Sequence, residues 1–596
     1  MNDVYRVLPA GTGAAPELVR RAGSGATWAT TVTGPTDPAG TSPDLMIIEL
    51  PAVHALSGFT SSWGLEFEPR SLVADEQVVW EVTSGRSSNG ALPWLAAETD
   101  AGVVVVTVHW SGNWRFVITP GSDGTQIAVG LHPEGQLVIL AEDEQLRLPE
   151  VSVAVGETPA DAGAALAALL SGQVPPSAAG LLTEWNHWWP YEDAEIDEAT
   201  FLAEATVAAD LGLEVAVLDA GWFGRPEANS DWVAERGDWH RVNTARFPHG
   251  LAWLAAETRR RGIAFGIWIE AEAIGPGASV ATEHPEIVAR TDDGPLGYVC
   301  LGSPAGRTHV HDHVARLIDE TGARWIKWDF NLDPGSGCRR DDHGHHADDG
   351  LLRHYLGLYA VLDRLAAAHP DTVFEACSSG GLRIDAGLAA HVDGFFLSDP
   401  DWTEHHLTCL WGAARLLPPR QLLHWPQSEW RGEHRFQKVD YSGTLITPAA
   451  FDTKIRAAML HRFGISVRLT QLRPDLRERL RHHLRVYERS VRPLLVDGLL
   501  RPLTDQPLRE EKGHRQPAFQ LTSGDEHVVA AFLLPPQWSW APILPTDLEP
   551  QAHYEVRDLD TDQPLGVSTG ADLSSVGLPA PGGSGTSGWW SVRRQR

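Results

Sequence analysis

The chain has 596 residues, of which 43% are hydrophobic and 21% charged, a composition typical of a globular protein with a large core. That length predicts two to four domains. The formal net charge of −30 argues against nucleic acid or an anionic membrane as a partner, because both are polyanions.

Residues 1–175 are predicted to form a β-rich domain. Runs of β-branched and apolar residues, separated by Gly, Asp, Ser and Pro turns, are typical of a β-sandwich. The predicted strands cover 45–50, 77–83, 102–110, 114–119, 125–131 and 136–141. A helix rich in alanine and leucine is predicted at 160–170.

From residue 176 the pattern changes to short apolar runs that alternate with helical patterns. Eight strands alternating with helices predict a parallel (β/α)8 barrel over 176–490 rather than an open sheet. The predicted strands cover 181–185, 215–219, 264–270, 324–329, 373–377, 394–399, 421–425 and 465–470. Strand patterns return at 526–534 and 553–559, so a C-terminal β-sandwich is predicted over 491–596. The fold class is therefore multidomain α/β.

Polar and aromatic residues gather at the carboxyl ends of the predicted barrel strands, where such barrels build their active sites. One carboxylate at a strand end is ordinary, because Asp often caps the following helix. Carboxylates after five of the eight strands converge on one cavity and predict a catalytic or sugar-binding pocket. The strand ends carry Glu184, Trp185, Asp219, Trp222, Trp268, Glu270, Glu272, Lys327, Asp329, Asn331, Cys377, Ser378, Arg383, Ser398, Asp399 and Asp401.

A pocket with several carboxylates and aromatic walls suits glycosidic chemistry, in which one carboxylate attacks and a second protonates the leaving oxygen. In the segment 325–331, W-I-K-W-D-F-N, alternate residues share one strand face, so Lys327 and Asp329 point the same way. Lys327 would keep Asp329 ionised, as a nucleophile requires. Asp399 follows an apolar strand, where burial would raise its pKa. The alternative for Lys327 and Asp329 is a buried structural ion pair.

These segments resemble one known family. W-I-K-W-D-F-N is similar to the nucleophile strand of glycoside hydrolase family 36, the melibiase-type α-galactosidases. L-D-A-G-W-F-G, G-I-W-I-E-A-E and C-S-S-G-G-L-R-I-D are close to that family's L-D-D-G-W-F-G, G-L-W-F-E-P-E and C-S-G-G-G-G-R-F-D. F-L-S-D-P-D-W stands where the family has its acid/base strand, S-D-N-T-D. With W-S-G-N-W near the N-terminus and Y-E-V-R-D-L-D-T near the C-terminus, the resemblance covers nearly the whole chain.

The resemblance implies an N-terminal β-supersandwich, a central barrel and a C-terminal β-sandwich. It implies a retaining α-galactosidase-like hydrolase with Asp329 as nucleophile and Asp399 as acid/base, without cofactor or metal. The sugar contacts that it implies are Asp219, Trp268, Lys327, Cys377, Ser378 and Arg383, and we add Trp185, Trp222, Glu270 and Asn331 from the same strand ends. The expected partner is an oligosaccharide or glycoside, and because family members are often oligomeric, a homo-oligomer stays open.

The chain departs from the family pattern at three places. The paired aspartates after the second barrel strand become Asp219-Ala220, the Leu-Asp before the nucleophile strand becomes Cys300-Leu301, and an Arg after the nucleophile segment becomes Leu332. Each departure removes a polar group that would bind one particular sugar hydroxyl. The sequence therefore leaves several functions open: an α-galactosidase, an α-glycosidase for another sugar, a transglycosylase of the raffinose-synthase kind, or a catalytically silent sugar-binding protein.

Cysteine and histidine spacing predicts no metal site. The four cysteines form no C-x-x-C pair, so neither a disulfide framework nor a zinc site is expected. His343, His345 and His346 lie in a polar stretch after the fourth barrel strand, and a solvated loop is favoured over a metal-binding loop. The N-terminal residues lack a basic and apolar leader, and no segment is long and apolar enough to span a membrane, so a cytoplasmic protein is expected.

Overall fold

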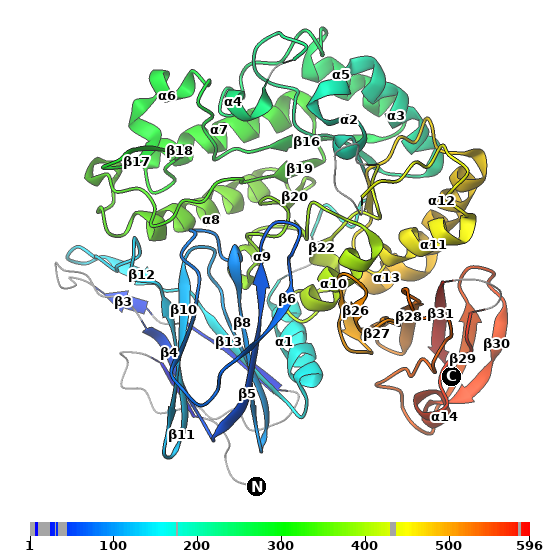
Figure 1. Ribbon diagram of the computed structural model, residues 1–596. Coiled ribbons are helices and arrows are strands. Elements are labelled where there is room, and N and C mark those ends of the chain that lie inside the picture. The colour runs from blue at the N-terminus through cyan, green and yellow to red at the C-terminus, as the bar shows by residue number, and fades with distance from the viewer. Residues whose placement is uncertain are drawn as a thin grey trace.

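The computed structural model describes residues 6–9, 24–29, 31–33, 44–174, 177–229, 231–429, 437–581 and 586–595. These residues form antiparallel sheets at the N-terminal side, a parallel barrel, and an antiparallel sheet at the C-terminal side (Figure 1). Among these residues no helix is both long and apolar enough to cross a membrane.

Two antiparallel sheets pack face to face in the N-terminal region. Buried side chains of the two sheets, which include Ile48, Val105 and Phe116, meet in one core, and β8, β9 and β13 are buried along almost their whole length. The first sheet has the order β1 (Arg6–Pro9), β4 (Asp44–Leu50), β11 (Gly124–Leu131), β10 (Trp114–Gly121) and β7 (Val78–Glu81). The second has the order β2 (Ser24–Trp28), β13 (Val151–Gly156), β9 (Gly102–Val108), β8 (Gly90–Thr99), β5 (Val53–Ser61) and β6 (Glu68–Leu72). A small ribbon pairs β12 (Gln145–Arg147) with β3 (Thr31–Thr33), and helix α1 (Pro159–Gln173) packs on β13.

The predicted strand at 136–141 is wrong, because this segment forms a loop that faces the barrel. The Gln136 side chain donates to the Asn113 carbonyl at 2.6 Å and accepts from Trp110 Nε1. Leu137 N donates to the carbonyl of Asp348, a barrel residue, at 2.9 Å. The polar groups of this loop are therefore committed to an interdomain contact rather than to a sheet ladder.

The eight predicted barrel strands are all present and pair in parallel. Their order is β22 (Leu422–Leu423), β21 (Gly394–Phe396), β20 (Val373–Ala376), β19 (Trp325–Trp328), β16 (Ala264–Ile269), β15 (Val215–Leu218), β14 (Glu184–Asn186) and β23 (Gly464–Ile465). Arg462 N donates to the Leu422 carbonyl at 3.1 Å and closes the ring between the outer strands. The strands from β15 to β22 end one to three residues before the predicted ends, because the polar residues there leave the ladder and face the site.

The long predicted helices surround this barrel. They are α3 (Glu198–Leu211), α5 (Gly250–Arg260), α7 (Pro304–Thr321), α8 (Gly350–Ala368), α10 (Thr403–Ala413) and α11 (Pro448–Ala457). The sequence analysis missed several short elements at the carboxyl ends of the strands: α2 (Trp188–Glu195), α4 (Trp232–Glu235), α6 (Val280–Glu283), α9 (Ala386–Ala389), and a hairpin of β17 (Val288–Thr291) and β18 (Gly294–Val299).

The charged segment after the barrel is helical, with a π-helical turn at Tyr487–Val491 between α12 (Pro474–Val486) and α13 (Arg492–Leu495). A six-stranded antiparallel sheet follows in the order β24 (Leu499–Pro502), β27 (Ala518–Ser523), β28 (Glu526–Phe532), β31 (Ser587–Arg594), β29 (His553–Asp558) and β30 (Pro564–Thr569). It is accompanied by a ribbon of β25 (Pro507–Leu508) and β26 (Lys512–Gly513) and by helix α14 (Gly570–Ser575). Its face packs on α11 and α13.

The segment W-S-G-N-W joins the N-terminal sheets to the barrel. The Asn113 amide donates to the carbonyl of Gly335 at 2.9 Å and accepts from Gly85 N at 2.6 Å. The Ser111 hydroxyl lies 2.6 Å from that of Tyr359 on α8. This contact holds the loops at one end of the N-terminal sheets against the carboxyl ends of the barrel strands (Figure 1).

Candidate active site

Asp329, the first residue after β19, is surrounded by hydrogen-bond donors. Its Oδ2 accepts from Trp268 Nε1 at 3.2 Å and from the Asn331 amide at 2.9 Å. Its Oδ1 accepts from Phe330 N at 2.8 Å and from Ser379 N at 3.3 Å. The side chain is thus fixed in direction, while the residue keeps 7% of its surface exposed. A carboxylate held this way is suited to attack from one side.

Lys327 forms its ion pair with Asp219 and not with Asp329, so the alternative of a structural ion pair between Lys327 and Asp329 is wrong. Its Nζ lies 3.2 Å from Asp219 Oδ2, and it sits over the rings of Phe396 and Trp425 at 4.4 and 4.3 Å. Asp219 is the first residue after β15, which is separated from β19 by β16 in the sheet. Lys327 and Asp219 therefore form one buried ion pair in the barrel interior.

Asp399 has the raised pKa expected of a general acid. Burial, and then the negative charge of Asp329, raise the pKa of Asp399 to about 6, against a hydrogen bond from Trp63 that lowers it. Trp63 Nε1 donates to Asp399 Oδ2 at 2.8 Å. Asp401, two residues further on, is fully buried and accepts from Ser428 N at 2.9 Å, which places it away from the site.

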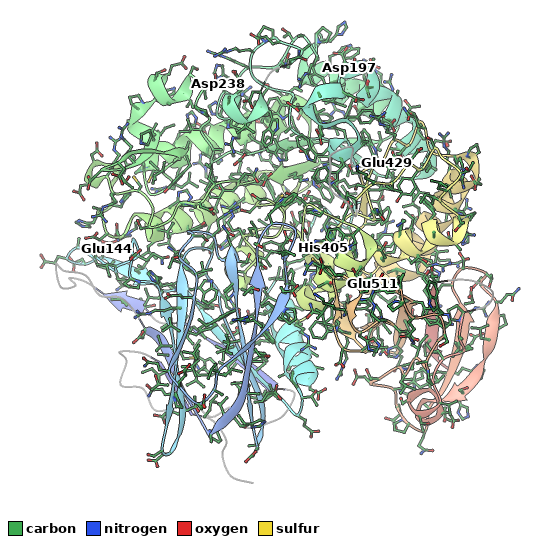
Figure 2. The ribbon with its side chains drawn as sticks, in the orientation of Figure 1. Glu144, Asp197, Asp238, His405, Glu429 and Glu511 are labelled. Atoms are coloured by element: carbon green, nitrogen blue, oxygen red, sulfur yellow. The ribbon has the colours of Figure 1, made fainter. Side chains whose placement is uncertain are left out.

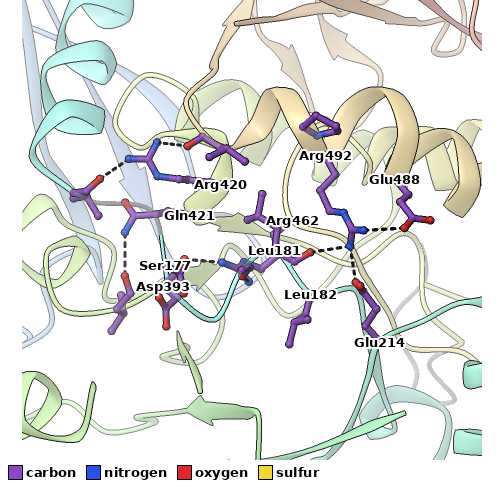
Figure 3. A pocket seen from close by; sticks show the side chains of 15 residues that line it. Ser177, Leu181, Leu182, Glu214, Asp393, Arg420, Gln421, Arg462, Glu488 and Arg492 are labelled. Carbon is purple, nitrogen blue, oxygen red and sulfur yellow. Dashed lines mark hydrogen bonds and ion pairs between the residues drawn. The ribbon is translucent and has the colours of Figure 1, made fainter. Parts of the chain in front are cut away.

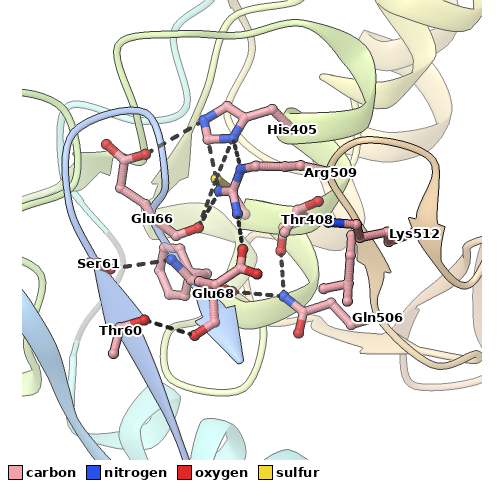
Figure 4. Close-up of polar contacts among 12 residues, drawn as sticks. Thr60, Ser61, Glu66, Glu68, His405, Thr408, Gln506, Arg509 and Lys512 are labelled. Atoms are coloured by element: carbon pink, nitrogen blue, oxygen red, sulfur yellow. Dashed lines mark hydrogen bonds and ion pairs between the residues drawn. The ribbon is translucent and has the colours of Figure 1, made fainter. Parts of the chain in front are cut away.

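The sequence analysis missed Trp63, which comes from the loop between β5 and β6 of the N-terminal sheets. The same loop carries Glu66, which accepts from the Ser398 hydroxyl at 2.7 Å, and His405 Nε2 lies 2.7 Å from that hydroxyl. Figure 4 shows Glu66 beside His405 and Arg509. Arg509 Nε donates to His405 Nδ1 at 2.8 Å, and burial raises the pKa of Glu66 to about 8. His405 lies where the barrel meets the N-terminal sheets (Figure 2). Three parts of the chain thus fix the backbone that carries Asp399.

The loop after β20 lies between the two carboxylates. Ser379 has a left-handed backbone (φ 46°), and its N–H donates to Asn331 Oδ1 at 2.8 Å. A Cβ on Gly380 would stand 2.6 Å from the backbone nitrogen of Asp399, so this position requires glycine. The Ser378 hydroxyl donates to the Phe330 carbonyl at 2.6 Å. Burial, and the charge of Asp329, raise the pKa of the Cys377 thiol, so Cys377 is neutral beside the nucleophile.

Two ion pairs support the nucleophile strand from behind. Glu270 accepts from Arg236 Nη1 at 3.0 and 2.9 Å and from Asn331 N at 2.6 Å. Glu272 accepts from Arg383 Nη1 at 3.0 Å; burial opposes ionisation of Glu272, but the Arg383 charge prevails and lowers its pKa to about 2. Glu270 has no exposed surface and Arg383 only 2%. Glu270 and Arg383 are therefore each engaged in a buried ion pair, and a sugar contact of either stays a prediction.

Two of the predicted aromatic contacts belong to the core. Trp185 and Trp222 have no exposed surface. Trp185 Nε1 donates to the Val467 carbonyl at 3.0 Å, and Trp222 Nε1 donates to the Trp268 carbonyl at 2.9 Å. These indoles are buried in the core and support the barrel. Partly exposed indoles lie nearby, since the Trp232 ring is 5.7 Å from that of Trp188 and 5.5 Å from that of Trp268.

A deeper carboxylate, Glu375, was also missed. It lies next to Lys327 in the register of β19 and β20, and burial raises its pKa well above the usual range. Glu184 is similar: burial raises its pKa to about 6, and it accepts from Trp425 Nε1 at 3.0 Å. A charged residue inside the apolar strand F-E-A-C was the signal available in the sequence, because Glu375 shares a strand face with Cys377.

The structure also brings together residues able to hold a metal ion, which corrects the expectation drawn from spacing. Cys300, Cys338, His343 and His345 are buried, and one ligand atom from each lies within 4.8 Å of the other three. The spacing rule missed this cluster because Cys300 comes from the end of β18, far along the chain from the other members. His346 is not part of the cluster.

The Melibiase family model matches residues 181–498. Alpha-galactosidase AgaA of Geobacillus stearothermophilus is 26% identical over 556 residues, which are 87% of this chain and 70% of AgaA. Alpha-galactosidase C of Emericella nidulans is 29% identical over 416 residues, which are 67% of this chain but only 50% of that relative. A crystal structure of AgaA in complex with stachyose superposes with a TM-score of 0.80 at 22% identity and covers 92% of this chain and 76% of AgaA. The galactosidase domain of the alpha-galactosidase-sucrose kinase AgaSK superposes equally well, with a TM-score of 0.80 at 20% identity, and covers 97% of this chain and 79% of that one.

Proposed function

The chain belongs to the melibiase family, and we propose that it is a retaining α-glycosidase of the α-galactosidase type that hydrolyses terminal α-linked sugars from oligosaccharides or glycosides. The observation that carries the proposal is the contrast between its two central carboxyl groups. Asp329 is held by four donor groups, whereas burial and the Asp329 charge raise the pKa of Asp399 to about 6. A nucleophile and an acid differ in this way.

In the proposed first step, an Asp329 oxygen attacks the anomeric carbon while the bond to the leaving oxygen breaks. Asp399 gives its proton to that oxygen, and a covalent glycosyl-enzyme forms. In the second step Asp399, now ionised, takes a proton from water, whose oxygen attacks the anomeric carbon and releases Asp329. The configuration of the sugar is retained because two inversions follow each other.

Other residues would bind and orient the sugar in this scheme. The Lys327–Asp219 pair presents a cation and an anion beside the nucleophile, suited to sugar hydroxyls. Trp268 and Asn331 direct Asp329 through their hydrogen bonds. The Trp188 and Trp232 rings provide flat apolar faces, on which the C–H groups of a sugar pack well.

A glycosidase for a sugar other than galactose is the second candidate, and Ala220 favours it. An apolar residue stands where the family has a second aspartate, and it is buried. Glu184 and Glu270 do not restore the missing acceptor, because each is bound elsewhere, Glu184 by Asn186 and Trp425 and Glu270 by Arg236. A transglycosylase uses the same two carboxylates. It differs in that a sugar hydroxyl, instead of water, attacks the glycosyl-enzyme in the second step.

The test is hydrolysis of a panel of 4-nitrophenyl α-glycosides, with the anomer of the first product read by NMR. We expect release of an α-anomer, and formation of a longer saccharide when an acceptor sugar is added would identify a transglycosylase. A β-anomer as first product would contradict the retaining mechanism, and no turnover on any glycoside would favour a silent binding protein. A cytoplasmic location is part of the proposal and is supported by four free cysteines, typical of a reducing compartment.

A further inference from the structure

We propose that Cys300, Cys338, His343 and His345 bind one structural zinc ion. The four residues, called the Cys/His cluster below, come from two segments. Cys300 follows strand β18, and the other three lie in the loop between β19 and α8. All four side chains are buried in the folded chain.

The spacing of the ligand atoms fits a tetrahedral ion. Cys300 Sγ lies 3.2 Å from His345 Nε2, and Cys338 Sγ lies 3.6 Å from His343 Nδ1. Zinc binds sulfur at about 2.3 Å and imidazole nitrogen at about 2.0–2.1 Å, so neighbouring ligand atoms of a tetrahedron are about 3.3–3.8 Å apart. The Cys/His cluster, in which the four atoms lie within 4.8 Å of one another, needs only small adjustments to reach this geometry.

The donor set selects zinc among the common ions. Two thiolates and two imidazoles in a tetrahedral arrangement favour zinc, whereas calcium and magnesium require oxygen ligands. Four protein ligands leave no open position for a reacting molecule, which is the pattern of a structural rather than a catalytic site. The two thiolate charges balance the charge of the ion, so the buried site would be neutral.

The surroundings orient one of the two histidine rings, that of His345, as a metal site requires. His345 Nδ1 lies 2.8 Å from the His346 carbonyl, so that Nδ1–H donates and Nε2 is left facing Cys300. His343 Nε2 has no hydrogen-bond partner among the described residues, and its Nδ1 faces Cys338. Neither ring is placed by a carboxylate at hydrogen-bond distance, although Asp349 Oδ1 lies 3.7 Å from His345 Nδ1.

The backbone around the Cys/His cluster is packed too closely for side chains at two positions. A Cβ on Gly302 would stand 2.6 Å from His345 Cδ2, and a Cβ on Gly350 would stand 1.8 Å from the Cys338 carbonyl oxygen. Glycine is therefore required where both segments approach the ligands. This close approach indicates a built site rather than a chance meeting of four side chains.

A second group of potential ligands, Glu66, His405 and Cys409, is already supplied with a positive charge. Arg509 Nε donates to His405 Nδ1 at 2.8 Å, and its guanidinium also donates to the Glu66 carbonyl. A metal ion there would have to replace that guanidinium, so this group is an ion-pair network. It provides a natural comparison for the Cys/His cluster.

The position of the Cys/His cluster gives the zinc a role in the proposed function without a part in the chemistry. Phe330, between Asp329 and Asn331, packs in one apolar group with Cys300 and Cys338, and Leu332 packs against that group. Two of the three departures from the family pattern, Cys300 and Leu332, thus belong to this group. The ion would join the hairpin of β17 and β18 to the loop that follows the nucleophile and so hold Phe330 in place.

The first experiment measures metal in the full-length chain, purified without a histidine tag. Mass spectrometry of the elements should find about one zinc ion per chain. Cobalt(II) exchanged into the site should show the absorption of tetrahedral coordination with thiolate-to-metal charge transfer. The proposal is wrong if the chain neither contains zinc nor takes up added zinc or cobalt, or if thiol counting shows that Cys300 and Cys338 form a disulfide.

Variants then locate the ion. Cys338→Ser and His343→Ala should lose zinc, and His343→Cys should keep it while changing the cobalt spectrum. Cys409→Ser, a buried cysteine of the comparison network, should keep it. A chelator should lower the Tm of wild type and of Cys409→Ser but not that of zinc-free Cys338→Ser. Loss of zinc from Cys409→Ser with retention in Cys338→Ser would overturn the assignment. Where Cys338→Ser fails to fold, the metal content and cobalt spectrum of wild type still decide. None of these readouts depends on glycosidase activity.

Discussion

The two ends of the barrel differ in how their charges are satisfied. At the amino end of the strands a cavity of about 590 Å³ is lined by Arg420, Arg462 and Arg492 (Figure 3). These cations are bound: Arg420 donates to the Val174 carbonyl at 2.6 Å, and Arg492 to Glu214 at 2.7 Å. At the carboxyl end, burial and the negative charge of Asp329 raise the pKa of Asp399 to about 6. The end of the barrel proposed to be reactive is therefore distinguished by carboxyl groups with raised pKa values, and not by the volume of a cavity.

The largest effect should come from the nucleophile at the carboxyl end. Asp329→Asn should lower kcat/KM on any activated glycoside by about 10³-fold or more, because the covalent step is lost. Steady-state kinetics with 4-nitrophenyl substrates measures this. Asp371→Asn, an exposed carboxylate at the amino end, is the matched control and should leave the rate unchanged. A variant of Asp329 that keeps a tenth of the wild-type rate would remove this residue from the nucleophile role.

The acid should show a dependence on the leaving group. Asp399→Asn should lower kcat by about 10²-fold or more on substrates with poor leaving groups and by less on 4-nitrophenyl glycosides, which leave without protonation. In wild type, kcat/KM should fall as the pH rises through about 6, since the acid must carry its proton and its pKa is raised to about 6. In Asp399→Asn this fall of kcat/KM near pH 6 should disappear. If the fall stays unchanged in the variant, a group other than Asp399 causes it.

Selectivity for the sugar should depend on Ala220. Ala220→Asp should shift preference towards galactose by about 1–2 kcal/mol in kcat/KM, because it restores an acceptor beside Asp219. The measurement compares α-galactoside and α-glucoside in wild type and in the variant, with Ala220→Val as a control for size. The idea of altered specificity fails if wild type already strongly prefers the galactoside and the new carboxylate adds nothing.

The N-terminal loop should tune the acid rather than perform chemistry. Trp63→Phe removes a hydrogen bond that stabilises ionised Asp399, so the pKa of Asp399 should rise and the limb near pH 6 should move to higher pH. The change in kcat/KM at the optimum should be less than about tenfold. Trp538→Phe, at an exposed indole of the C-terminal region, should leave the profile in place. A limb that stays or moves to lower pH would show that Trp63 does not act on this carboxyl.

The smallest effect should come from the amino end. Glu488→Gln removes one i,i+4 ion pair with Arg492, 3.2 Å long, and should change the free energy of unfolding by about 0.5 kcal/mol or less. Urea unfolding measures this. Activity should equal that of wild type. A clear loss of turnover in this variant would mean that the two ends of the barrel are coupled, and would contradict a purely structural role for the charges at the amino end.

The barrel was predictable because parallel strands buried on both faces appear as apolar runs, and polar residues at their ends stand out. Asp329 and Asp399 were predicted as site residues in this way. The pairing of Lys327 with Asp219 was missed because alternation along one strand says nothing about other strands, and Asp219 follows β15, two strands away from β19. Trp185 and Trp222 were assigned to the pocket because a strand end alone does not tell whether an indole faces the cavity or the core.

Contacts between distant segments were beyond the sequence pattern. Trp63 occupies a turn of the N-terminal sheets with no motif around it, and only the docking of that region brings it to Asp399. The ligands of the Cys/His cluster are divided between a hairpin that was itself missed and a loop without regular spacing. In both cases the missing information was the tertiary structure, which decides which loops meet at the carboxyl ends of the barrel strands.

The hydrogen bond from Trp63 also has a consequence for how the chain folds during its synthesis on the ribosome. Its two partners are 336 residues apart, and the earlier one belongs to a region that is synthesised before any barrel strand. Domains generally fold in the order in which they emerge. The N-terminal sheets can therefore fold first. Asp399 can accept its hydrogen bond from Trp63 only after β21 has been synthesised and the barrel has closed and docked on these sheets. A nascent chain halted before that point would contain the N-terminal sheets but neither a closed barrel nor Asp399.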